Sequence, residues 1–140
     1  MKVVMARPNK TVDCNLRQAR ERLKYARAYL AAAELALVES GDEYAAVSAG
    51  NAVLAGIAAV DAICGHALRK CSRSPDHRDA IELVKSATSA GPEYGKSLGR
   101  LLDLKDAAHY GFTEFSRSDA RKSVRLAESL VHGAESLFGR

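Results

Sequence analysis

The residues best suited to chemistry in this chain of 140 residues are clustered near position 105. Residues 101–111 read Leu-Leu-Asp-Leu-Lys-Asp-Ala-Ala-His-Tyr-Gly, which interrupts an apolar pattern with polar groups. Residues three and four apart share one face of a helix, so Lys105 and His109 continue the side that carries Leu98 and Leu101. His109 could then transfer a proton near neutral pH, and Lys105 could hold a phosphate oxygen or stabilise developing negative charge.

A purely structural interpretation of the same stretch stays open. Lys105 and His109 are cationic or polar side chains that suit the carbonyl end of a helix, and Gly111 could supply a left-handed cap. The ring of Tyr110 could pack against the next loop while its hydroxyl stays in water. In that case the apolar stripe simply ends where its helix ends.

Three polar residues elsewhere would join this site if the helices that carry them converge on it. Asn51 and Asp61 interrupt a segment that is otherwise almost wholly apolar, and His77 lies where a third helix is expected to begin. An unpaired buried carboxylate is very costly, so Asp61 must have a partner, reach solvent, or lie at an interface or site. Asp61 could orient Lys105 or His109 for catalysis, or it could form an ordinary interhelical ion pair with Lys105.

The composition indicates a soluble helical protein and excludes several functional classes. Hydrophobic residues make up 47% of the chain and charged residues 27%, alanine is abundant, and tryptophan is absent, which favours closely packed helices. A net charge of +4 is too small for a dedicated DNA-binding surface. No nucleotide-binding glycine motif, zinc-protease motif or nucleophile elbow is present. We expect no cofactor.

The cysteines and histidines also argue against a metal site. Cys14, Cys64 and Cys71 include no CxxC pair, and the histidines are scattered along the chain, so neither a disulfide framework nor a metal centre is indicated. A reducing cytoplasmic location fits best. The apolar run over residues 52–63 is too short and too rich in glycine and alanine to span a bilayer, so no membrane association is expected.

Hydrophobic periodicity predicts an all-α, up-and-down bundle of about five helices. Residues 1–14 show no periodicity and are predicted to be a flexible lead-in, followed by one helical domain over residues 15–140. Leucine recurs every seven residues from Leu16 to Leu37, which predicts a first helix over residues 15–39. A second, central helix is expected over residues 42–70, followed by a basic loop. Ser74 and Pro75 indicate the start of a third helix that ends near position 87.

The rest of the chain is expected to contain two more helices. Gly91 and Pro92 indicate a loop over residues 88–95, and the fourth helix should run from about 96 to 110. Ser116 or Ser118 should cap the last helix. Arg125 and His132, with six residues between them, lie on one flank of that last helix. They could form an active pair, although the fourth helix is the better candidate.

Three segments together resemble a prokaryotic HEPN domain. They are Asn-Ala-Val-Leu-Ala-x-Ile-Ala-Ala-Val-Asp-Ala in the second helix, Asp-His-Arg-Asp-Ala at the third, and Leu-x-x-Leu-Leu-x-Leu-Lys-x-x-Ala-His-Tyr-Gly in the fourth. The resemblance covers residues 15–138. It implies a helical bundle that forms a homodimer, and many HEPN domains are metal-independent endoribonucleases of toxin–antitoxin and defence systems.

The resemblance also bears on activity. The nuclease signature of the family is Arg, four to six residues, then His, whereas Lys105 replaces the Arg here and three residues separate it from His109. The stretch is closer to the variant form Arg-x-x-Ala-Asp-Tyr-Gly, with Lys105, His109 and Tyr110 at the Arg, Asp and Tyr positions. In some HEPN toxins a partner nucleotidyltransferase modifies a Tyr two positions after the motif His, whereas Tyr110 follows His109 directly.

The sequence therefore supports three hypotheses. The first is a non-catalytic or weakly active HEPN-like dimeric module that binds a nucleotide, RNA or a partner protein, for example a nucleotidyltransferase antitoxin. The alternative is a metal-independent endoribonuclease that uses His109 and Lys105, with Asp61 or His77 assisting. The third is a helical partner for another protein, which docks through an exposed apolar patch on the first or last helix.

Overall fold

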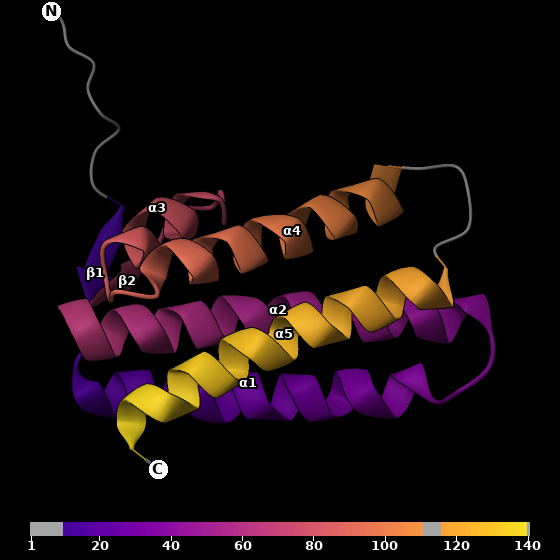
Figure 1. Ribbon diagram of the computed structural model, residues 1–140, viewed down its shortest axis with the longest axis horizontal. Coiled ribbons are helices and arrows are strands. Elements are labelled where there is room, and N and C mark those ends of the chain that lie inside the picture. Colours follow the sequence, from indigo (N-terminus) through magenta and orange to yellow (C-terminus); the bar gives the residue numbers. More distant parts are fainter. Residues whose placement is uncertain (1–9, 111–115, 140) are drawn as a thin grey trace, which may run out of the picture.

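The computed structural model describes residues 10–110 and 116–139, except for the side chains of residues 107–110. These residues form five helices and a small two-stranded sheet, which confirms the expected all-α bundle (Figure 1). The elements are, in order, β1 (Thr11–Asp13), α1 (Leu16–Leu37), α2 (Asp42–Leu68), β2 (Lys70–Ser72), α3 (Asp79–Lys85), α4 (Gly91–Tyr110) and α5 (Arg117–Phe138).

Helix α1 follows the predicted heptad pattern. Asn15 caps it in a reciprocal box, in which the Gln18 backbone N–H donates to the Asn15 side chain and the Asn15 N–H donates to the Gln18 side chain, each at 2.8 Å. The buried positions repeat at intervals of three and four along the helix: Ala19, Leu23, Ala26, Leu30 and Ala33. This stripe packs against α2 and α5.

Helix α2 is the centre of the bundle, as its alanine-rich sequence predicted. It contacts α1, α4 and α5, and small residues allow the close approach. A Cβ atom on Gly56 would lie 2.5 Å from Leu101 Cδ1, and one on Gly65 would lie 2.8 Å from Ala19 Cβ. Among the described residues α2 alone is long and apolar enough to cross a membrane, and 67% of its most apolar window is buried inside the bundle.

The sheet was not predicted. Residues 11–13 were assigned to the flexible lead-in and residues 70–73 to a loop, but β1 and β2 pair antiparallel, with Val12 opposite Cys71. The Cys14 N–H extends the pairing by donating to the Arg69 carbonyl at 2.8 Å. Strands of three residues are too short to show a hydrophobic period, so only the tertiary structure reveals them.

The starts of α3 and α4 also differ from the prediction. Ser74 does not cap a helix. Its Oγ accepts from the Asp76 N–H and donates to Asp79, and the chain turns before α3 begins at Asp79. Helix α4 begins at Gly91, inside the segment expected to be a loop. A Cβ atom on Gly91 would lie 2.3 Å from the Val84 carbonyl oxygen, so glycine is required by the close approach of α3.

Helix α5 begins where expected and closes the bundle. The Ser116 side chain caps it by accepting from the Asp119 N–H at 3.0 Å. Arg117, in its first turn, donates to the carbonyl oxygens of Leu37 and Glu39 at the end of α1. In Figure 1, α4 rises away from α2 towards its C-terminal end. Residues of α4 line two grooves, one together with α2 and one together with α5.

Candidate functional site

One face of the central helix α2 is left uncovered by the bundle. Tyr44, Val47, Asn51 and Leu54 are spaced at intervals of three, four and three, which places them on one side of a helix. The side chains of Tyr44, Val47 and Leu54 are 42%, 51% and 44% exposed. The sequence predicted a helix buried on most sides, and this face is the exception.

A groove beside this face, here named the α2–α4 groove, brings together three of the predicted site residues. Asn51 on α2, His77 in the turn before α3 and Lys105 on α4 line it, and it encloses about 450 Å³. Its remaining lining is apolar or glycine: Val47, Gly50, Val53, Leu54 and Ile57. The Asn51 amide nitrogen donates to the Val47 carbonyl at 3.1 Å, which orients the side chain and leaves its oxygen available to accept.

Asp61 lies in an adjoining pocket, which shares Ile57 and His77 with the α2–α4 groove. Its carboxylate is paired with Arg22 of α1, whose Nη2 and Nε lie 3.0 and 3.1 Å from the same oxygen, Oδ2. Burial raises the pKa of the Asp61 carboxyl to about 6, although the Arg22 guanidinium opposes that shift. The pocket therefore holds a carboxyl group that changes charge near neutral pH.

The predicted constellation is thus partly assembled in the described residues. Asn51, His77 and Lys105 share one groove, and Asp61 adjoins it. The partner of Asp61 is Arg22, so the suggested ion pair with Lys105 is wrong. The side chains of His109 and Tyr110 lie outside the described residues. Helix α4 continues through both positions, which places His109 one helical turn beyond Lys105.

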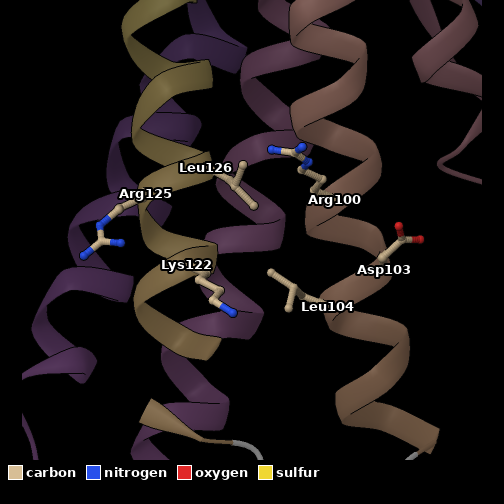
Figure 2. A pocket seen from close by; sticks show the side chains of 6 residues that line it. All are labelled: Arg100, Asp103, Leu104, Lys122, Arg125 and Leu126. Carbon is tan, nitrogen blue, oxygen red and sulfur yellow. The ribbon is translucent and has the colours of Figure 1, made fainter. Parts of the chain in front are cut away.

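A second groove lies between α4 and α5 and was missed by sequence reasoning. This α4–α5 groove encloses about 430 Å³, and its lining residues are Arg100, Asp103, Leu104, Lys122, Arg125 and Leu126. Figure 2 shows Leu104 of α4 facing Leu126 and Lys122 of α5, with Arg100 directed towards Leu126. Exposed Arg and Lys residues are common on helices, so no local pattern distinguishes these from the rest of the surface.

The Arg125–His132 pair does not assemble into a site. Arg125 lines the α4–α5 groove and, in Figure 2, extends away from α4, whereas His132 lines none of the grooves described here. His132 instead acts electrostatically on Glu34 of α1, whose pKa is raised chiefly by a hydrogen bond with Glu128 and also by burial. The two side chains therefore belong to different surroundings.

Within residues 10–106 and 116–139, no group of three His, Cys, Asp or Glu side chains could hold a metal ion. Cys14 and Cys64 are buried free thiols, and Cys71 is half-buried and also free. Comparison with known proteins yields no match to any protein-family model, curated protein or solved structure.

Proposed function

We propose that this protein is a HEPN-like dimeric module that binds a nucleotide, free or as one unit of an RNA, in the α2–α4 groove without cleaving it. The observation that carries this proposal is the convergence of Asn51, His77 and Lys105 on one groove with an apolar wall. Sites for small ligands typically combine an apolar lining with a few polar groups that fix orientation, and a volume of about 450 Å³ lies in their usual range.

Each lining group suits one part of a nucleotide. The exposed Lys105 ammonium can pair with a phosphate, which forms a charge-assisted hydrogen bond. Asn51 and His77 carry an amide and an imidazole, which can hydrogen-bond to the polar edge of a base or to ribose hydroxyls. The apolar side chains Leu54 and Ile57 offer a surface for the flat face of the base.

The absence of cleavage is inferred from the residues in the motif. Lys105 replaces the Arg of the HEPN nuclease signature, and the spacing to His109 is shorter than that signature requires. The alternative activity, metal-independent cleavage by Lys105 and His109, would need the His109 imidazole to transfer a proton at the attacking 2′-hydroxyl or the leaving oxygen. The experiment below therefore includes both residues.

The dimer is proposed on the uncovered face of α2. Tyr44, Val47 and Leu54 expose apolar side chains along the face beside the groove, and exposed apolar surface is characteristic of sites of association. A second copy of the chain seated on this face would border the α2–α4 groove, because Val47 and Leu54 belong to both. The resemblance to HEPN domains, which are commonly dimeric and often part of toxin–antitoxin or defence systems, favours the same arrangement.

Calorimetric titration tests the binding. Adenosine 5′-monophosphate and a short single-stranded RNA are titrated into the full chain, into Lys105→Ala and His77→Ala, and into Lys96→Ala as a matched control. Lys96 is an exposed lysine of the same helix that lines none of the grooves described here. Loss of a charge-assisted hydrogen bond of roughly 1.5–3 kcal/mol should weaken binding by about tenfold or more in Lys105→Ala, whereas Lys96→Ala should bind like the wild type.

Cleavage is assayed on the same RNA in the presence of a chelator, together with His109→Ala. Intact RNA that binds to the wild-type protein supports the proposal. RNA that is cut by the wild type but not by His109→Ala and Lys105→Ala would establish the nuclease alternative. Absence of binding by both probes, or equal binding by Lys105→Ala and Lys96→Ala, would overturn the assignment of the α2–α4 groove.

A further inference from the structure

The α4–α5 groove has an apolar floor between two helices. Leu104 and Leu126 are both half-buried and face each other across it (Figure 2). Leu104 is one helical turn from Arg100, and Leu126 is one turn from Lys122, so each leucine is paired with a cation on its own helix. The apolar floor therefore consists of one leucine from each helix, with a cation one turn away on the same helix.

The charge around this floor is positive and uncompensated in the described part of the chain. Arg100, Lys122 and Arg125 are exposed, and none of them forms an ion pair with another described residue. The acid in the lining, Asp103, is paired with Arg78 of α3 at 3.0 Å and in Figure 2 points away from α5. A ligand in the groove would meet cations whose charge no described acid neutralises.

The chemistry of the lining favours carboxylates over nucleic acid. Proteins that bind single-stranded nucleic acid stack bases on aromatic or imidazole rings, and the lining of this groove contains neither kind of ring. The groove also lacks the amide and imidazole groups that the α2–α4 groove offers to a base. The planar guanidinium of Arg100, in contrast, matches a carboxylate in a two-pronged hydrogen bond. The two leucines can receive an aliphatic side chain.

We propose that the α4–α5 groove is a docking site for a short acidic segment of a partner protein. One aliphatic side chain of that segment lies between Leu104 and Leu126, and flanking carboxylates pair with Arg100 and Lys122. Arg125 adds positive charge at the outer edge of α5 and attracts the segment from a distance. This site is separate from the proposed nucleotide site, since the two grooves share no lining residue.

Fluorescence anisotropy with a defined peptide tests the proposal. The probe is a labelled peptide in which leucine recurs every three or four positions and all remaining positions are glutamate. One control peptide carries lysine in place of glutamate, and another carries serine in place of leucine. The full-length protein should bind the glutamate–leucine peptide, and both control peptides should bind at least tenfold more weakly because each lacks one half of the match.

Charge reversal identifies the surface that binds. Arg100→Glu and Lys122→Glu should each weaken the glutamate–leucine peptide by at least tenfold, because attraction becomes repulsion at two exposed positions. Arg121→Glu is the matched control: it changes the same charge at the neighbouring exposed position of α5, which does not line the groove. Circular dichroism verifies that each variant keeps the helical content of the wild type.

The same measurement can overturn the proposal in three ways. The glutamate–leucine peptide could fail to bind, or Arg121→Glu could weaken it as much as Lys122→Glu does, which would indicate general charge attraction. A single-stranded RNA could also bind to the wild type instead of the peptide, and bind more weakly to Arg100→Glu and Lys122→Glu, which would make the groove a nucleic-acid site. Loss of nucleotide binding in Lys105→Ala leaves this result unaffected, so the two proposals fail independently.

Discussion

The two grooves on either side of α4 differ in the kind of side chain that each collects. The α2–α4 groove contains one amide, one imidazole and one ammonium group beside an apolar wall, whereas the α4–α5 groove contains cations around two leucines. Asn51 of the first groove is unusual in its apolar sequence surroundings, whereas the cations of the second groove are ordinary surface residues. A site can therefore be visible in a sequence or invisible in it, depending on how unusual its residues are locally.

The two grooves share one support. Helix α4 separates them, and its buried leucines Leu98 and Leu101 anchor it on α2, where Gly56 leaves room for the Leu101 side chain. The chemistry on each side is set by which residues of α4 turn outward. Changes to the shared anchor should consequently affect both grooves, and changes to one lining should affect only one.

The largest effect is expected from Leu101→Ala. Leu101 is fully buried, so its truncation leaves a cavity beneath α4 and should lower the free energy of unfolding by about 2–5 kcal/mol. Urea denaturation measures the loss, and both nucleotide and peptide binding should weaken. Leu104→Ala is the control: that residue is half-buried in one groove, so it should cost about 1 kcal/mol and affect the peptide alone. Equal effects of the two substitutions would contradict the shared anchor.

A smaller effect is expected from Asp61→Asn, and it depends on pH. The pKa of Asp61 is about 6 in the folded protein, compared with 3.8 as its ordinary value, so the folded state holds this proton more tightly. The unfavourable burial of the charge is present above pH 6 and is relieved as the pH falls from 6 towards 4. Protonation of Asp61 should raise the free energy of unfolding by on the order of 3 kcal/mol as the pH falls from 6 to 4.

Urea denaturation at pH 7 and pH 5 measures this dependence. In Asp61→Asn the gain on acidification should be smaller than in the wild type by the contribution of this carboxyl. If Asp61→Asn and the wild type gained the same stability between the two pH values, the carboxyl would not titrate in this range.

The smallest effect is expected from Leu54→Asp. Leu54 is 44% exposed on the uncovered face of α2, so a charge there should leave the fold intact but weaken the proposed dimer by about tenfold. Light scattering after size exclusion, over a range of concentrations, measures the change. Leu35→Asp, at a 71% exposed leucine of α1, should leave the assembly unchanged. A wild-type protein that is monomeric at every concentration would exclude the dimer.

Long periodic segments made most of the fold predictable. The leucine heptad of α1 and the alanine-rich sequence of α2 specify long helices without reference to the rest of the chain, and both helices form at the expected positions. The structure of short or exceptional segments could not be predicted from the sequence. Gly91 resembles a loop residue in the sequence, but it is the first residue of α4. The residue is glycine because α3 packs against it too closely for a side chain.

The residues of the candidate site were predictable, but their arrangement in space was not. Asn51, His77 and Lys105 could be selected because each is polar where its neighbours are apolar or where a helix begins or ends. Their shared groove could not be derived, since it depends on where α4 crosses α2. The partner of Asp61 was likewise undetermined, because Arg22 is one of several arginines on α1, and only the packing of α1 on α2 selects it.

The sequence by itself determined the helical class, the central place of α2 and the residues that could do chemistry, because periodicity and residue type are local properties. The tertiary structure decided which of those residues meet, which face of α2 remains open and where surface cations gather into a groove. Those outcomes depend on the angles and distances at which helices cross. These are set by side chains far apart in the chain, such as Gly56 and Leu101, and no local pattern records them.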